Sequence, residues 1–250
     1  MNRYINIIFF ITFIITLNSL IANAQNYNVY TPQNYNQKLI NNKERILFIV
    51  DFSNSMIEKI DGKRKIDIAV STLEKILPQI SNDVYVGFRA YGHKSGLTYY
   101  DSCKASSLLA PPALNNLAKV HSSLYKLKPE GATPITYSLK QAVNNDFGYF
   151  VGKKRIILLT DGGENCDESP CTYALELIKQ RNDFRIDVIA LDINDKDAYN
   201  QLKCVALATS GKFYSANTAA ELLNSFQDSL NIKKEVQGMI IPWMLGVLGW

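Results

Sequence analysis

The sequence predicts an α/β protein with a doubly wound, mostly parallel six-stranded sheet, helices on both faces and one antiparallel edge strand. Two short runs, residues 45–50 and 155–160, are almost continuously apolar, as strands buried on both faces of a sheet are. Segments with helical spacing of apolar residues alternate with further strand-like runs. This alternation is typical of parallel sheets with right-handed crossovers.

The predicted elements follow in chain order. Apolar residues recur every three or four positions over residues 65–80, which predicts a helix after the first strand. Further strands are expected at residues 84–91, 106–110 (the antiparallel edge), 155–160, 185–192 and 212–215. Further helices are expected at residues 114–127, 134–143, 172–180 and 197–209. Thr218 and Glu221 have the spacing of a capping box for one last helix.

Length and composition favour one folded domain. The chain has 250 residues, of which 47% are hydrophobic and 20% charged, with 13 Gly and 8 Pro. Such a composition excludes a collagen-like chain and a wholly disordered one, and one core can serve a chain of this length. The net charge is only +4, and the densest basic run, residues 63–65, is expected to be a solvated helix start. The sequence therefore predicts no nucleic-acid partner.

The first 24 residues have the pattern of a secretory signal peptide. A short basic start contains Arg3, residues 5–17 are apolar, and residues 22–24 form an A-x-A cleavage pattern. An uncleaved membrane anchor is the alternative, but it needs about 20 apolar residues, and the polar residues 18–19 interrupt this run. We expect residues 1–24 to be removed and the protein to be secreted, periplasmic or held in the cell envelope.

Three further segments complete the expected organisation. Residues 25–43, rich in Asn, Gln and Tyr, are predicted to be a flexible lead-in, and the folded domain is expected over residues 44–235. Residues 236–250 form an apolar C-terminal tail that is too short to span a bilayer. Its residues 238–250 either pack on the domain or contact a partner or membrane surface through Trp243 and Trp250.

Oxygen-bearing side chains stand where the predicted strands end. Asp51, Ser53 and Ser55 form a D-x-S-x-S pattern after the first strand, Asp161 follows the strand at 155–160, and Thr133 precedes a helix. Because ligands bind at the carboxyl ends of parallel strands, these three loops are expected to converge. Carboxylate and hydroxyl oxygens suit Mg²⁺, Mn²⁺ or Ca²⁺.

The hydroxyl groups also have a local explanation. Thr133 before Pro134 has the pattern of a helix N-cap followed by proline, and Ser53 or Ser55 could cap a helix as well. The D-x-S-x-S pattern alone is a weak signal, and its coincidence with Asp161 at a second strand end favours the metal interpretation.

On these residues the chain resembles the von Willebrand factor A domain family over roughly residues 45–234. The resemblance implies the sheet order 3-2-1-4-5-6 and a metal-ion-dependent adhesion site. It implies that Ser53, Ser55 and Thr133 coordinate the ion, and that Asp51 and Asp161 bind it directly or through water. Residues 91–93, 161–166 and 170–171 more loosely resemble an exported bacterial subgroup.

The resemblance implies a non-enzymatic function. A cation held largely by neutral hydroxyls keeps an open position that an Asp or Glu carboxylate of a protein partner can take. A metal-dependent hydrolase is one alternative, since a bound ion can activate water, and a metal-free scaffold is another. A dehalogenase-like D-x-D motif is excluded by Ser53, and no G-x-S-x-G surrounds Ser53 or Ser55.

The four cysteines, Cys103, Cys166, Cys171 and Cys204, favour two disulfides in an exported protein. A zinc site is less favoured because their spacing is not C-x2-C and no histidine lies near. In the sheet order implied by the resemblance, several strands separate Cys103 from Cys204, too far for a disulfide. The preferred pairs are Cys103–Cys166 and Cys171–Cys204, while a local Cys166–Cys171 bond would leave the other two free.

His93 follows the strand at residues 84–91 and could reach the same edge of the sheet. A single histidine is more often a hydrogen-bonded structural residue than a ligand. We therefore assign it no role in the metal site.

Overall fold

The structure is a computed structural model that describes residues 43–148 and 150–232. The expected signal peptide (1–24), all but the last residue of the lead-in (25–43) and the apolar tail (236–250) lie outside this part of the chain. None of the helices in the described part is both long and apolar enough to cross a membrane.

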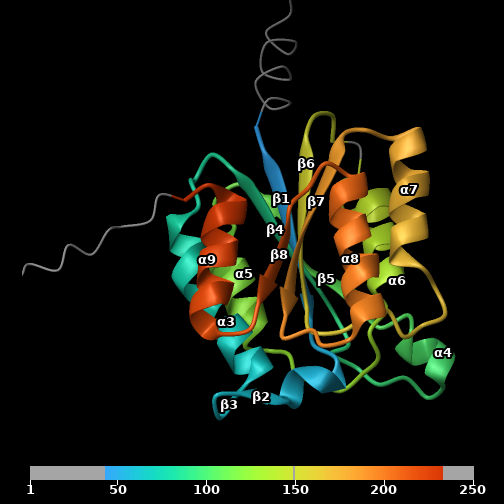
Figure 1. Ribbon diagram of the computed structural model, residues 1–250. Helices are drawn as coiled ribbons and strands as arrows, with labels where there is room; N and C mark the ends of the chain where they lie inside the picture. The colour runs from blue at the N-terminus through green and yellow to red at the C-terminus, as the bar shows by residue number, and fades with distance from the viewer. Residues whose placement is uncertain (1–42, 149, 233–250) are drawn as a thin grey trace, which may run out of the picture. The chain divides into compact units, whose positions relative to one another are not determined.

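A six-stranded sheet runs through the centre of the domain (Figure 1). Its order is β5-β4-β1-β6-β7-β8, which is 3-2-1-4-5-6 when only these strands are counted along the chain, as expected. All neighbours are parallel except β5, which pairs antiparallel with β4 at one edge. The strands are β1 (Arg45–Asp51), β4 (Tyr85–Tyr91), β5 (Ser106–Ala113), β6 (Lys154–Thr160), β7 (Phe184–Leu191) and β8 (Phe213–Ala216).

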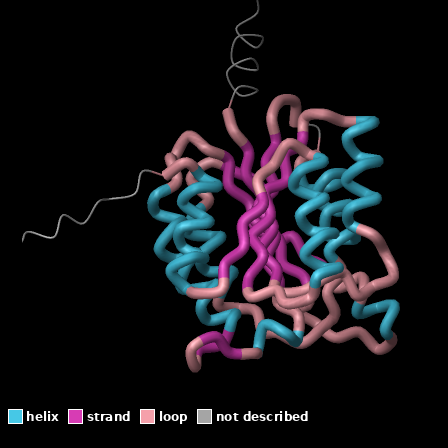
Figure 2. The backbone as a smooth tube through the Cα atoms, in the orientation of Figure 1, coloured by secondary structure: helices cyan, strands magenta, loops and turns pink. Residues whose placement is uncertain are grey.

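Helices cover both faces of this sheet (Figure 2). One face carries α3 (Lys65–Ile76), α5 (Leu117–Leu124) and α9 (Ala219–Leu230). The other carries α6 (Ile135–Gln141), α7 (Pro170–Gln180) and α8 (Lys196–Ala208). The predicted doubly wound α/β class is confirmed.

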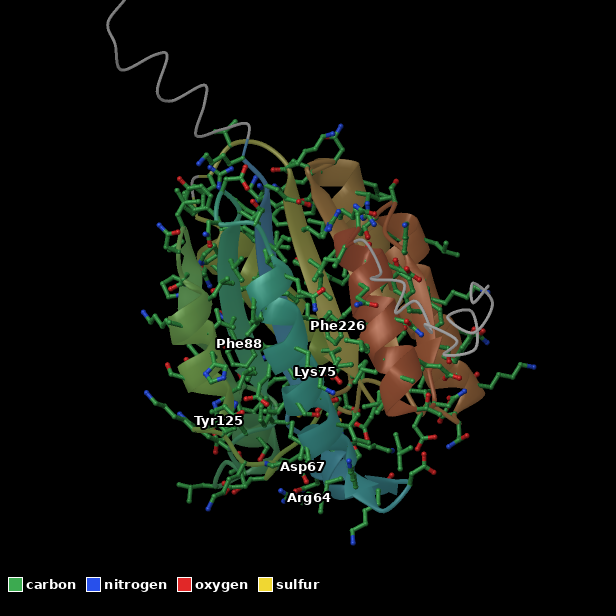
Figure 3. The ribbon with its side chains drawn as sticks, turned by 90° about the vertical axis from the view of Figure 1, so that its left-hand side faces the viewer. Arg64, Asp67, Lys75, Phe88, Tyr125 and Phe226 are labelled. Carbon is green, nitrogen blue, oxygen red and sulfur yellow. A yellow bond between two sulfur atoms is a disulfide. The ribbon has the colours of Figure 1, made fainter. Side chains whose placement is uncertain are left out.

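The central strands are apolar throughout because both of their faces are buried. In β1, Phe48 and Val50 point into the core beneath α3 and α9, while Leu47 and Ile49 point into the core beneath α6 and α8, as the two-residue period of a strand requires. Figure 3 shows the first of these faces, with Phe226 of α9 labelled. Its ring lies 6.2 Å from that of Phe48.

The helix boundaries differ from the predicted ones for local reasons. Helix α3 ends at Ile76 and continues as a 3₁₀ turn, η2 (Leu77–Gln79), which contains Pro78. The helix predicted over residues 114–127 is shorter, because the chain reaches Asn115 in the left-handed conformation and enters α5 only at Leu117. Helix α6 widens into a π turn, η3 (Ala142–Asp146).

Three short elements at the carboxyl end of the sheet were not predicted. They are a 3₁₀ turn, η1 (Asn54–Ile57), a hairpin of β2 (Lys59–Ile60) and β3 (Lys63–Arg64), and one helical turn, α4 (Tyr99–Ser102). Elements of two to four residues are too short to show a periodic pattern. All three lie at the end of the sheet where β1 and β6 end (Figure 1).

The preferred disulfide pairing is confirmed. Cys103 is bonded to Cys166, and Cys171 of α7 is bonded to Cys204 of α8.

The expected capping box of α9 is half formed. Thr218 accepts from the Glu221 backbone N–H, whereas the Glu221 carboxylate accepts from the backbone of Asn217, one residue earlier than the pattern requires.

Candidate metal site

The candidate site lies in the loops that follow β1 and precede α6. Ser53 forms an isolated parallel bridge with Gly131, and the Asn54 N–H donates to the Gly131 carbonyl at 3.1 Å. Glycine is required here, because a Cβ at Gly92 would lie 2.5 Å from the Ser53 nitrogen and one at Gly131 would lie 2.4 Å from the Lys94 carbonyl. The D-x-S-x-S loop and the Thr133 loop are therefore held together by their backbones.

The predicted hydroxyls converge at this point. The Ser53 and Ser55 hydroxyl oxygens are 3.0 Å apart, and the Ser55 hydroxyl donates to Asp161 Oδ1 at 2.7 Å across 106 residues of sequence. Thr133 is 5% exposed and lines a pocket of about 420 Å³ together with Ser53 and Ser55. All three hydroxyl residues thus face one hollow in the surface.

None of the expected helix caps uses these hydroxyls. Ser53 is the N-cap of η1, but its side chain makes no capping hydrogen bond. The N-cap of α6 is Pro134, so Thr133 stands one residue outside that helix and its side chain does not cap it. The purely local explanation of Ser53 and Thr133 is therefore not supported.

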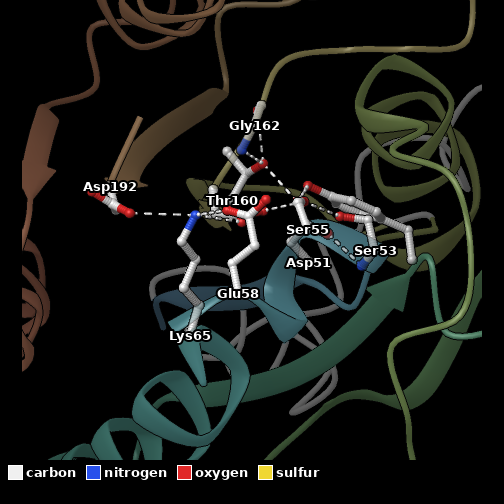
Figure 4. A network of polar contacts seen from close by, with 10 residues as sticks. Asp51, Ser53, Ser55, Glu58, Lys65, Thr160, Gly162 and Asp192 are labelled. Carbon is white, nitrogen blue, oxygen red and sulfur yellow. Dashed lines mark hydrogen bonds and ion pairs between the residues drawn. The ribbon is translucent and has the colours of Figure 1, made fainter. Parts of the chain in front are cut away.

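Asp51 is fully buried and takes part in the network of polar contacts drawn in Figure 4. Its Oδ1 accepts from the Ser53 N–H at 2.6 Å, and its Oδ2 accepts from the hydroxyls of Thr160 at 2.8 Å and Tyr91 at 3.0 Å. Burial, together with the charge of Asp161, raises the pKa of Asp51 to about 6. The carboxylate is fixed in place by neighbours that are themselves buried or hydrogen-bonded.

Asp161 stands at the end of β6, 6% exposed. Its Oδ2 accepts from Lys65 Nζ at 3.1 Å, and its Oδ1 accepts from Ser55. Burial raises the pKa of Asp161, although the hydrogen bonds from Ser55 and Lys65 oppose the shift. Two neighbouring carboxylates whose pKa values are both raised by burial form a place where a bound cation would relieve an unfavourable charge.

Lys65 contradicts the expectation that residues 63–65 are a solvated helix start. Lys63 and Arg64 are exposed, but the Lys65 side chain is only 4% exposed. Its ammonium lies within 3.4 Å of three carboxylates, Glu58, Asp161 and Asp192 (Figure 4). The β2–β3 hairpin returns the chain so that the Lys65 N–H donates to the Glu58 carbonyl, which turns the side chain inward.

The loop after β6 also holds the Thr133 backbone. The Thr133 N–H donates to Asn165 Oδ1 at 2.7 Å, and Glu164 accepts from the backbones of Thr136 and Cys166 at 2.7 and 3.0 Å. In the sequence, residues 161–166 carry only a looser family resemblance. Nothing in the sequence indicates that Glu164 and Asn165 reach a loop thirty positions upstream.

His93 is 5% exposed, and its Nε2 lies 3.0 Å from the Ser107 hydroxyl of β5. Burial lowers the pKa of His93 to about 4. These contacts agree with the structural role expected for it.

Over residues 43–148 and 150–232, no group of three or more His, Cys, Asp or Glu is placed to hold a metal ion. The predicted ligand set is of another kind, because it combines two carboxylates with three hydroxyls. The structure brings Asp51, Ser53, Ser55 and Asp161 into one hydrogen-bonded group, and Thr133 joins them at the pocket wall. Their role as ligands stays a prediction.

Known proteins are similar to this chain in sequence or in fold. YwmD, an uncharacterized protein of Bacillus subtilis (strain 168), is 28% identical over 80% of this chain and 90% of its own length. The solved von Willebrand factor type A structure from Catenulispora acidiphila gives a TM-score of 0.58 at 18% identity, covering 75% of this chain and 42% of that one.

A third similar protein is proximal thread matrix protein 1 from the mussel byssus, solved with a zinc-occupied MIDAS motif. Its TM-score is 0.56 at 18% identity, covering 75% of this chain and 45% of that one. This chain spans less than half of each of the two solved structures, and at such identities the likeness shows the fold alone.

The family model described as the von Willebrand factor type A domain matches residues 46–229. Since that match covers most of the chain, the protein belongs to the von Willebrand factor type A domain family.

Proposed function

We propose that this protein binds a divalent cation at Ser53, Ser55 and Thr133, with Asp51 and Asp161 contributing directly or through water, and that it uses the ion to hold a carboxylate of a protein partner. The supporting observation is the convergence of three loops at one pocket, where the Ser53 and Ser55 hydroxyls lie 3.0 Å apart and Asp161 accepts from Ser55. Mg²⁺ is the proposed ion, and Mn²⁺ or Ca²⁺ suits the same oxygen donors.

The hydroxyls and the carboxylates of the proposed site have different roles. The hydroxyls of Ser53, Ser55 and Thr133 are neutral donors at the pocket wall, and the two carboxylates lie behind them, 0% and 6% exposed. Bound there, the cation would supply an electrophilic position for a partner's Asp or Glu. Such a contact, made where water is partly excluded, is a strong charge-assisted interaction.

The metal part of the proposal is tested by calorimetric titration with Mg²⁺ and Mn²⁺. Thr133→Ala and Ser55→Ala should lower the affinity at least tenfold. Ser95→Ala is the matched control, because Ser95 lines the same pocket but belongs to another loop. Equal heats for the native protein and both ligand variants would remove the metal site from the proposal.

The adhesive part is tested by capturing cell-envelope proteins on the immobilised protein, in Mg²⁺ and in chelator. A partner should be retained in Mg²⁺, released by chelator, and absent from the Thr133→Ala column. A partner that is retained equally in Mg²⁺ and in chelator, and equally by the native protein and Thr133→Ala, would contradict a carboxylate–ion contact.

An exported location is part of the same proposal. The two disulfides are typical of oxidising compartments, and residues 1–24 have a signal-peptide pattern. Membrane-surface contact through residues 238–250 is tested by liposome flotation of the mature chain with and without that segment. Equal flotation would exclude the contact.

A further inference from the structure

Three exposed apolar side chains lie within four residues of one another, on a segment beside the candidate metal site. Leu97 is fully exposed, and Tyr99 and Tyr100 are 58% and 69% exposed. No other stretch of four residues in the described chain exposes three large apolar side chains. We call these three side chains the aromatic platform. Exposed apolar groups gathered in one place mark binding surfaces more often than scattered ones do.

One member of the platform, Tyr99, lines the pocket, and the other two stand beside it in the sequence. The same pocket of about 420 Å³ is lined by Ser95, Tyr99 and Ser102 on the platform side, and by Ser53, Ser55 and Thr133 on the side of the proposed ligands. In Figure 1, α4 stands at the end of the sheet where β1 and β6 end. A carboxylate entering this pocket therefore brings its neighbouring residues against α4.

The segment that carries the platform is held firmly although it lies at the surface. Thr98 and Asp101 form a complete capping box around α4, and the Gly96 N–H donates to the Ser102 hydroxyl at 2.9 Å. A Cβ at Gly96 would lie 2.2 Å from that of Asp101, so the turn is tight. The disulfide of Cys103 fixes the end of α4 to the loop after β6.

This order matters for binding. Tyrosine presents a large amphipathic contact area and loses little conformational entropy on association, and a surface that is already ordered loses less still. Lys104 lies 5.3 Å from the Tyr100 ring centre, and Lys94 is exposed next to the segment. Residues 94–104 thus carry two lysines against one carboxylate, that of the exposed Asp101, and this net positive charge favours an acidic partner on this side. Glu130 is the one carboxylate residue in the pocket lining.

We propose that the aromatic platform binds an apolar side chain that lies within about two residues of the carboxylate presented to the ion. The recognised element is thus an exposed segment of a protein partner in which Asp or Glu adjoins Leu, Phe, Tyr, Trp or Pro. This inference rests on the proposed function, since the carboxylate has to reach the cation site.

The test is a selection from a library of random heptapeptides displayed on phage, with the full mature protein as target in Mg²⁺ and elution by chelator. The eluted peptides should be enriched in Asp or Glu with an apolar neighbour. Synthetic copies should bind Leu97→Ser/Tyr100→Ser at least tenfold more weakly than the native protein. Both replaced side chains lie outside the pocket lining, so the Mn²⁺ affinity of this variant should stay within twofold of native.

The matched control is Leu175→Ser/Ile178→Ser on α7, which removes two other exposed apolar side chains and should leave peptide affinity unchanged. Acidic peptides without apolar neighbours, or peptides that bind the Leu97/Tyr100 variant as tightly as the native protein, would overturn the platform and leave the proposed function standing. A selection that yields no chelator-eluted peptide would overturn both.

Discussion

Lys65 brings a fixed positive charge to the edge of the candidate site. Its ammonium is 3.1 Å from Asp161 Oδ2, and the other Asp161 oxygen accepts from Ser55. The lysine thus takes up part of the negative charge that Asp161 would offer to a cation. At the effective dielectric of a protein surface region, a unit charge a few ångströms away changes a binding free energy by a few kcal/mol.

Lys65→Met should therefore strengthen Mn²⁺ binding about tenfold, or about 1.4 kcal/mol, measured by calorimetry. Without cation the variant should be less stable by about 2 to 3 kcal/mol, because Asp161 and Asp192 lose their buried partner. The increase in melting temperature on adding Mn²⁺ should accordingly be larger than in the native protein.

Two controls accompany this prediction. Lys65→Arg keeps the charge and should bind Mn²⁺ as the native protein does. Lys154→Met removes another buried lysine, which begins β6 and is paired with Asp183. This change should alter the stability but not the Mn²⁺ affinity. Weaker Mn²⁺ binding by Lys65→Met would show that the lysine supports the site rather than competing with the ion.

The five proposed ligands could be chosen as candidates from the sequence because each lies at or next to the end of an element with a clear pattern. Asp51 is the last residue of β1 and Asp161 directly follows β6, and both strands are fully buried. Lys65 could not be found this way. Its burial depends on the β2–β3 hairpin and on carboxylates from two other loops, and basic residues at a helix start are usually solvated.

The two disulfides tie different pairs of elements. Cys103–Cys166 joins the end of α4 to the loop after β6, next to Asn165, which holds the Thr133 N–H. Cys171–Cys204 joins α7 to α8 on one face of the sheet. Their sequence separations are 63 and 33 residues, for which loop closure predicts similar stabilities of about 4 kcal/mol each.

Replacing Cys103 and Cys166 together by serine should lower both stability and Mn²⁺ affinity, the latter at least fivefold, because Asn165 and the Thr133 loop lose a covalent constraint. Replacing Cys171 and Cys204 together by serine should lower the stability by a similar amount, measured by urea denaturation. The Mn²⁺ affinity of the folded protein should stay unchanged. If both pairs change the affinity equally, the first disulfide has no specific effect on the site.

The long strands and helices could be predicted because their burial in the sheet, or against it, sets the spacing of their apolar residues. The strands β1 and β6 were predicted to within one residue, and the antiparallel β5 was located although it continues to Ala113 through two prolines, which edge strands tolerate. Helix ends were less accurate. The π turn after α6 makes a contact far along the chain that no local pattern indicates, because Arg89 of β4 donates two hydrogen bonds to Asp146 of that turn.

The whole domain holds the two carboxylates of the candidate site at the carboxyl end of its sheet at a cost to its stability. In chelator, Asp51 has a pKa of about 6 in the folded protein, against 3.8 as the ordinary value. Its charged form is therefore unfavourable in the folded state at any pH above about 6, and the penalty disappears below about 4, where the carboxyl is protonated in both states. The shift corresponds to at most about 3 kcal/mol.

Asp51→Asn should consequently be more stable than the native protein in chelator at pH 8, by about 1 to 3 kcal/mol in urea denaturation. The amide can still accept from the Ser53 N–H and can donate to Thr160, whose own hydroxyl is 2.9 Å from the Gly162 carbonyl and can donate there instead. The buried Tyr91 hydroxyl loses its acceptor, because an amide nitrogen cannot accept its hydrogen bond, and this loss costs about 1 kcal/mol at either pH. At pH 4 the charge penalty is gone, so the variant should be slightly less stable than the native protein. With Mg²⁺ at a hundred times its dissociation constant, the free energy of unfolding of the native protein should rise by about 2.7 kcal/mol and that of the variant should rise little. The difference in stability between the two proteins is then cancelled or reversed.

A variant that is less stable than native in chelator at pH 8 would contradict the charge penalty, and equal stabilisation of both proteins by Mg²⁺ would show that the ion binds elsewhere.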